Sequence, residues 1–186
     1  RAIKIIEDSS QRPLSELFTS FDEEAIAAAS IAQVHKARLA DGRVVAVKIL
    51  RPGIAKLMRR DVRFFRAMAR LAEAVAPGLR RLKLVTAVQQ FEQISDIELD
   101  LRMEAAAGTR LQENMANDKG IRIPHIDLER TNSHMLVIEW IEGIRIDDVE
   151  ALQAAGHDIA KITEAAATSF FNQVFRDGYF HADMHP

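Results

Sequence analysis

The clearest pattern in the chain is a change from strand-like to helical spacing of apolar residues near position 51. Before that point, β-branched and aliphatic residues gather on both sides of Asp41-Gly42, over residues 31–39 and 44–50. An Asp-Gly pair between two apolar runs is a strong hairpin signal, because glycine accepts the positive φ of a tight turn. We therefore predict two antiparallel strands joined at Asp41-Gly42.

Four further segments have apolar residues at helical spacing. A short helix is predicted after Pro13, and long helices are predicted over residues 54–75, 85–115 and 158–176. A compact apolar strand is expected at residues 135–138. The side chains expected on the buried side of the 54–75 helix are Leu57, Val62, Phe65, Met68, Ala69 and Ala72.

Strands and helices are mixed here without the regular alternation of a doubly wound sheet. The predicted order is a hairpin, two long helices, a strand, a loop, a helix and a polar C-terminal segment. This order is typical of the α+β class, with long helices inserted into an antiparallel sheet.

Composition narrows the class of protein further. The 186 residues are 48% hydrophobic and 28% charged, as in a globular protein with a real core, and the formal net charge of −2 argues against nucleic-acid binding by bulk charge. The absence of cysteine excludes disulfides and thiolate metal sites. No apolar run approaches the roughly 20 residues that span a bilayer.

Basic residues are nevertheless concentrated within the predicted 54–75 helix. A solvated helix face is the ordinary interpretation of such a concentration, and a binding patch is the alternative. The residues concerned are Lys56, Arg59, Arg60, Arg63 and Arg66.

Lys48 is the first candidate for chemistry. It ends the run Val45-Ala46-Val47-Lys48, so its ammonium can reach a cleft while the neighbouring side chains enter the core. In kinases a Val-Ala-x-Lys strand carries the lysine that pairs with nucleotide phosphates and with a helical glutamate. Taken alone, the tetrapeptide fits a solubilising surface lysine as well.

A glutamate partner for Lys48 is expected on the following helices. Asp100 and Glu104 are four residues apart and share a helix face, whereas Glu98 points nearly opposite Asp100. The alternative is a solvated acidic face on which Glu98 pairs with Arg102.

Small residues precede the first strand of the hairpin, where a kinase keeps its glycine-rich phosphate loop. Alanine allows a close backbone approach but lacks the positive-φ freedom of glycine. The alternative is small residues packed under the hairpin. The four residues are Ala27, Ala28, Ala29 and Ser30.

The C-terminal run His181-Ala182-Asp183-Met184-His185 allows three interpretations. Asp183 can accept or orient a proton during phosphoryl transfer, as in the kinase His-Arg-Asp motif. In an extended segment His181, Asp183 and His185 would share one side, which suits a two-His-one-carboxylate metal site. Alternatively, His181 is a buried structural histidine and His185 lies on the surface.

In this order, the motifs resemble the UbiB family of atypical protein-kinase-like proteins, and a bacterial member in particular. The resemblance covers nearly the whole chain, and four motifs in order are far more specific than any one of them. The matching segments are 21–35, the lysine strand 45–53, Glu98-Leu99-Asp100 with Glu104-Ala105, and residues 175–186.

The resemblance implies a role for each motif. Lys48 would bind the nucleotide α/β-phosphates with Glu104 as its ion-pair partner and Glu98 as the second choice, and the 27–30 segment would cover the phosphates. Glu139, Trp140 and Ile141 would form the hinge against the adenine, and Asp183 would be the catalytic aspartate. Residues 1–142 would form the kinase-like N-lobe with family-specific helices, and residues 143–186 the start of the helical C-lobe.

At the level of function, the resemblance implies an ATP- or ADP-binding kinase or ATPase that uses Mg²⁺ and supports ubiquinone (coenzyme Q) biosynthesis. Expected partners are a quinone-precursor lipid or membrane surface and other ubiquinone-biosynthesis proteins, at the cytoplasmic face of the inner membrane. A nucleotide-gated lipid-binding or scaffold protein without useful phosphoryl transfer is the alternative. A small-molecule kinase of the aminoglycoside type fits the alanine-rich segment less well.

The sequence also departs from the family pattern. The Lys-x-Gly-Gln segment would lie upstream, the metal-binding asparagine and Asp-Phe-Gly-type aspartate would follow Pro186, and the C-terminal hydrophobic anchor is missing. We therefore expect this chain to be part of a longer protein and, by itself, to be inactive. We also expect the 158–176 helix to expose Phe171 or Phe175.

Overall fold

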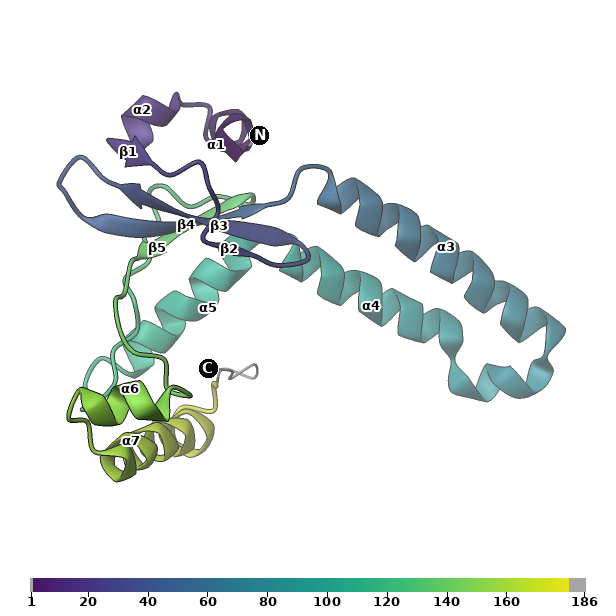
Figure 1. The fold of residues 1–186 in the computed structure, drawn as a ribbon. Helices are drawn as coiled ribbons and strands as arrows, with labels where there is room; N and C mark the ends of the chain where they lie inside the picture. The colour runs from purple at the N-terminus through teal and green to yellow at the C-terminus, as the bar shows by residue number, and fades with distance from the viewer. Residues whose placement is uncertain (1, 181–186) are drawn as a thin grey trace.

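The centre of the protein is an antiparallel sheet, which the computed structural model describes within residues 2–180 (Figure 1). The strand order is β1-β3-β4-β5, and β2 also pairs with β3. The strands are β1 (Ser20–Phe21), β2 (Ala27–Ala28), β3 (Ala32–Arg38), β4 (Val44–Leu50) and β5 (Met135–Glu139).

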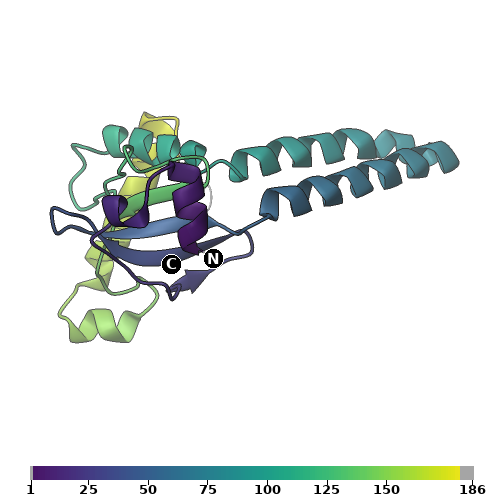
Figure 2. The ribbon, with the colours of Figure 1, turned by 90° about the horizontal axis from the view of Figure 1, so that it is seen from above.

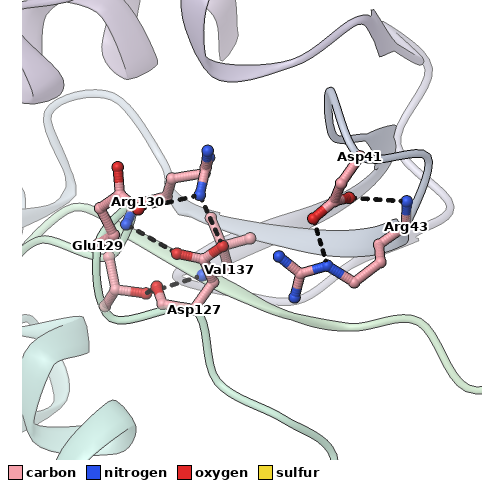
Figure 3. Close-up of polar contacts among 7 residues, drawn as sticks. Asp41, Arg43, Asp127, Glu129, Arg130 and Val137 are labelled. Atoms are coloured by element: carbon pink, nitrogen blue, oxygen red, sulfur yellow. Dashed lines mark hydrogen bonds and ion pairs between the residues drawn. The ribbon is translucent and has the colours of Figure 1, made fainter.

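The predicted hairpin at Asp41-Gly42 is confirmed. β3 and β4 pair in register from Ala32 opposite Leu50 to Arg38 opposite Val44. Gly42 has a φ of 86°, and the Asp41 carboxylate accepts hydrogen bonds from the Arg43 backbone amide at 3.0 Å and from its Nε at 2.7 Å (Figure 3). The turn is thus closed by both the backbone and an Asp–Arg pair.

Helices α1 (Ala2–Ser10) and α2 (Leu14–Leu17) cover one face of the sheet (Figures 1 and 2). Ile6 of α1 is fully buried against the side chains that β4 and β5 direct to this face. The short helix after Pro13 is confirmed, but α1 was missed. Its only buried residues are Ala2 and Ile6, which is too little apolar pattern to mark a helix in a polar segment.

The opposite face packs on helix α5 (Leu101–Asn114), which lies below the sheet in Figure 1. Leu101 and Ala105 of α5 are 1% and 2% exposed and contact Leu50 and Leu136 of the sheet. Side chains of β4 alternate between the two faces of the sheet, so they enter two separate cores. On the α5 face these are the side chains of every second residue from Ala46 to Leu50.

The predicted single helix over 85–115 is wrong, because the structure divides it into α4 (Leu84–Glu98) and α5. Leu99 has non-helical geometry, and the Asp100 carboxylate caps α5 by accepting a hydrogen bond from the Arg102 amide at 3.1 Å. A capping aspartate inside a continuous apolar pattern restarts the helix in a new direction.

Helix α3 (Ile54–Val75), a 3₁₀ helix η1 (Pro77–Leu82) and α4 form a helical hairpin that extends away from the sheet (Figures 1 and 2). The bounds of α3 agree with the prediction, but its expected buried side is largely wrong. Only Val62 and Ala69 are buried, while Leu57, Phe65 and Met68 are 44–49% exposed. The reason is that α3 packs mainly on one helix, α4, which covers a narrower stripe of its surface than a sheet or a layer of helices would.

The C-terminal part contains α6 (Val149–Ala154), α7 (Ile159–Phe171) and a π-helical turn η2 (Asn172–Arg176), below α5 in Figure 1. The predicted helix over 158–176 is confirmed, with Asp158 as its cap. Phe171 and Phe175 are 54% and 79% exposed, as expected.

A buried polar turn leads the chain into β5. The amide of Asp127 donates to the carbonyl of Val137 at 2.9 Å, and its carboxylate accepts from the amide and the guanidinium of Arg130 at 3.1 and 2.9 Å (Figure 3). Since Asp127 is 7% exposed, the bonds to Arg130 satisfy a carboxylate that would otherwise be costly to bury. The helices within residues 2–180 include none with the length and apolar character to cross a membrane.

Candidate active site

Lys48 lies on the face of β4 that points toward α5. Its Cα partners are Val34 on β3 and Leu136 on β5, so it occupies the middle of the sheet. The strand keeps this residue in place because Val47 and Ile49 on either side of it are fully buried in the other core.

The Lys48 ammonium forms a bidentate ion pair with Glu104 of α5. Its Nζ is 2.9 Å from Oε1 and 2.7 Å from Oε2 of the carboxylate. The side chains are 29% and 48% exposed, so water screens the pair and its contribution to folding is at most about 1 kcal/mol. The Glu104 carboxylate therefore fixes the position of the Lys48 ammonium beside the sheet. A solvated lysine at a strand edge would have no such partner.

Two further carboxylates, Glu98 and Asp100, lie in the pocket of this ion pair. Glu98, Asp100 and Glu104 line one pocket of about 660 Å³ together with Lys48. The predicted alternative, a Glu98–Arg102 pair, is wrong: Arg102 pairs with Asp100 at 2.6 Å, and its hydrogen bonds hold the pKa of Asp100 below the usual value. The remaining lining residues are Ile97, Met103, Ala106, Ala107, Arg110 and Tyr179.

The alanine-rich segment forms a tight hairpin with β3, the strand next to the lysine strand β4. Ala27 pairs with Val34, which in turn pairs with Lys48, and the Ala29 amide donates to the Ala32 carbonyl at 2.9 Å. Ala27, Ala28, Ala29 and Ser30 are all exposed, so the alternative of small residues buried under the hairpin is wrong.

Arg51 anchors this hairpin to the end of β4. Its Nε donates to the Ala29 carbonyl at 2.9 Å, and its amide donates to the Ile31 carbonyl at 2.8 Å. The sequence reasoning missed this role. The only signal was the position of Arg51, directly after the lysine strand.

Glu139, the last residue of β5, and the segment after it lie beside the first residues of β4, at the end of that strand away from Arg51. Glu139 accepts hydrogen bonds from Arg122 at 2.7 Å and from the His125 amide at 3.1 Å, and these bonds hold its pKa below the usual value. The Trp140 amide donates to the Val44 carbonyl at 3.1 Å, and Lys36 lies 4.5 Å from the centre of the indole ring. Ile141 is exposed.

The proposed catalytic residue Asp183 lies outside the described residues, as do His181 and His185. Their three predicted interpretations therefore stay predictions. Within residues 2–180, no group of three or more His, Asp or Glu side chains is placed to hold a metal ion.

The structure thus pairs the sheet lysine with the helical glutamate and places the alanine-rich hairpin on the neighbouring strand β3, whereas Glu139 and Trp140 line a different pocket. Residues 1–186 match the ABC1 atypical kinase-like domain. The chain belongs to this family. The resemblance to UbiB-type proteins and the α+β kinase-like fold are both confirmed.

Curated relatives named "Probable protein kinase UbiB" support this assignment. The protein from Marinobacter nauticus is 46% identical over 98% of this chain and 33% of its own length. The Aliivibrio fischeri protein is 42% identical over 94% of this chain and 32% of its own length. The chain therefore spans about a third of the length of these relatives.

A solved structure has the same architecture. It is the complex of Rv3197 with erythromycin from Mycobacterium tuberculosis. The likeness has a TM-score of 0.69 and 29% sequence identity, and it covers 79% of this chain and 36% of that one.

Proposed function

We propose that the full-length protein is an ATP-binding atypical kinase or ATPase that supports ubiquinone biosynthesis. The observation that carries this proposal is the bidentate pair between Lys48 and Glu104, made across a sheet and a helix of an ABC1 kinase-like domain. In kinases this lysine–glutamate pair must be formed before the lysine can hold the nucleotide phosphates.

Lys48 would contact the α/β-phosphates of ATP or ADP, because its ammonium is a compact cation held at a fixed point of the sheet. Glu104 would orient that ammonium, and the exposed alanine-rich hairpin at Ala27–Ala28 and the turn after it would lie over the phosphates. Lys48 suits a nucleotide chemically, because its ammonium is partly exposed and screened by water in the free protein. A polyphosphate would offer it a stronger hydrogen-bonding partner.

The segment Glu139, Trp140 and Ile141 would border the adenine. The amides of Glu139 and Trp140 already donate to the carbonyls of His125 and Val44. We therefore assign adenine recognition to the backbone beyond them, at Ile141.

Magnesium bound to the nucleotide would neutralise phosphate charge during transfer. Within residues 2–180 no group of three or more acidic or histidine side chains could hold it, so we assign no magnesium ligand among them and derive no step from the metal. By the family resemblance, those ligands would follow Pro186. Asp183 would accept or orient the proton of the attacking group.

The cellular role rests on the relatives named UbiB. We propose action at the cytoplasmic face of the inner membrane, with a quinone-precursor lipid or the membrane surface and other ubiquinone-biosynthesis proteins as partners. Nucleic acid is not among the proposed partners, because the net charge is −2.

The direct test is ATP binding by full-length protein in which Lys48 is changed to alanine. We expect a loss of affinity of roughly tenfold or more, since a charge-assisted contact to phosphate is lost. Lys119→Ala, at an exposed position outside the pocket, is the matched control and should bind ATP like the parent. Unchanged binding by Lys48→Ala would contradict the phosphate role.

An enzyme and a nucleotide-gated scaffold are separated by changing Asp183 to asparagine in the full-length protein. The enzyme predicts that ATP hydrolysis and support of ubiquinone synthesis are lost together. Loss of hydrolysis with normal ubiquinone levels would instead favour the scaffold.

A further inference from the structure

A second, larger pocket lies where β4 runs into α3. Its volume is about 830 Å³, and it is bounded by α1, the β4–α3 junction, the first half of α3 and part of α4. It shares no lining residue with the pocket around Lys48. Apolar side chains form part of its wall, namely those of Ile5, Leu50, Ile54 and Leu99.

Cations dominate the polar lining of this pocket. Lys56, Arg59, Arg63 and Arg66 follow one another at spacings of three and four residues, which places them in a stripe along one side of α3. Against this stripe, the pocket has only two carboxylates, Asp8 and Glu92, and Glu92 is already paired with Arg66.

The other three cations of the stripe have no protein partner within residues 2–180. No carboxylate lies within ion-pair distance of Lys56, Arg59 or Arg63, and no hydrogen bond from their side chains is made there. The Nε of Arg66 is buried without a hydrogen-bond partner. Donors of this kind normally find an acceptor when they are withdrawn from water.

Helix stability does not explain this arrangement. The amino end of a helix carries partial positive charge and favours acidic residues, yet the first turn of the 22-residue α3 has none. Like charges four residues apart, as at Arg59 and Arg63, repel each other. Gly53 precedes α3 without a side-chain cap, so at the helix end that borders the pocket no side chain accepts from the first amides, and only the Ile54 amide has a backbone acceptor outside the helix, the Arg51 carbonyl at 3.2 Å.

We propose that this pocket binds the phosphoryl group of a phosphate or diphosphate ester, at a site separate from that of Lys48. Guanidinium groups suit phosphate because their donors match its oxygens in pairs. The stripe of Arg59 and Arg63 would hold the anion, Arg66 Nε would supply a further donor, and the apolar wall would contact the organic part of the ester. The ester is either a soluble metabolite or a lipid headgroup.

The test measures pyrophosphate binding by calorimetry in full-length protein that carries Lys48→Ala, a substitution that on the proposed function removes phosphate binding at the other site. In this background we expect Arg59→Gln with Arg63→Gln to weaken binding by about tenfold or more. The matched control is Arg70→Gln with Arg81→Gln, which makes the same change in net charge at exposed positions outside the pocket and should leave binding unchanged. The single substitutions Arg59→Gln and Arg63→Gln, each expected to weaken binding several-fold, repeat the test if the double variant is destabilised.

A second arm uses phosphatidylcholine vesicles with and without phosphatidic acid to identify the source of the phosphoryl group. Binding of pyrophosphate that depends on Arg59 and Arg63 supports a soluble ester. Binding only to phosphatidic acid vesicles, with the same dependence, supports a lipid headgroup. The proposal is overturned if neither probe binds, or if the pocket and control variants weaken binding equally, because the effect would then be one of overall charge.

Discussion

Lys48 and Glu104 are 56 residues apart in the sequence, yet both carboxylate oxygens of Glu104 lie within 2.9 Å of the Lys48 ammonium. The pair connects the central strand β4 to α5, and its two side chains remain partly exposed. Such a pair contributes little to the free energy of folding. We therefore infer that its role is to fix the position of the Lys48 ammonium.

The first prediction follows from that difference. Glu104→Gln should change the free energy of unfolding by less than about 1 kcal/mol, because a screened ion pair is weak. In full-length protein the same variant should lower ATP turnover by roughly tenfold or more, because Lys48 loses its orienting partner. Urea denaturation and steady-state hydrolysis measure the two effects. Glu113→Gln, an exposed residue of the same helix, is the control. Equal turnover in the two variants would remove the orienting role.

The second prediction concerns the anchor of the alanine-rich hairpin. Arg51→Ala removes the 2.9 Å bond to the Ala29 carbonyl but keeps the backbone bond to Ile31. We expect faster amide hydrogen exchange at Ala29, whose amide closes the turn, with little change in the rest of the sheet. Arg38→Ala, which loses only an exposed bond to the Gly42 carbonyl, should leave exchange at Ala29 as in the parent.

The third prediction tests the core beneath the site. Leu101 is 1% exposed and packs between α5 and the sheet, so Leu101→Ala should lower the free energy of unfolding by about 2–5 kcal/mol. The same substitution at Leu128, which is 59% exposed, should stay within about 0.5 kcal/mol of the parent. Chemical denaturation compares the two. A small effect at Leu101 would mean that α5 is not a structural part of the site.

The fourth prediction is a pH dependence at Glu139. Its hydrogen bonds with Arg122 and the His125 amide hold its pKa below the ordinary 4.5. A carboxylate with a lowered pKa contributes stability above pH 4.5, and that contribution is lost as the pH falls through the folded-state pKa. The parent should therefore lose more stability than Glu139→Gln when the pH is lowered from neutral to below 4.5. If the free energy of unfolding depended on pH in the same way for the two proteins, the hydrogen bonds of Glu139 would make no contribution to stability.

The sequence predicted the elements whose signal is local. The Asp41-Gly42 hairpin, the bounds of α3 and the strand at β5 each depend on a turn residue or on a regular apolar period. It missed α1, whose two buried residues matter only because the sheet lies beneath them. The sequence pattern also predicted one helix where the structure has α4 and α5, because the apolar spacing continues through the break at the Asp100 cap.

The site was predictable to a similar extent. Motif order led to Lys48 and to the alanine-rich segment. The family resemblance ranked Glu104 before Glu98 as the partner of Lys48, but apolar spacing and helix periodicity do not distinguish the two. That choice depends on the turn at Leu99, which places Glu98 at the end of α4 and Glu104 inside α5. The anchor formed by Arg51 also exists only in three dimensions, because the carbonyl that it binds belongs to another strand pair.

The projecting hairpin of α3 and α4 has a consequence for how this protein can diverge among its relatives. Its two helices pack mainly on each other and on η1, so substitutions in its outer half disturb few residues of the sheet. Mutational effects in the two regions should therefore be nearly additive. Residues on the outer surface of the hairpin, such as the exposed Phe64 and Leu71, can therefore be substituted during evolution while Lys48 and its surroundings stay unchanged.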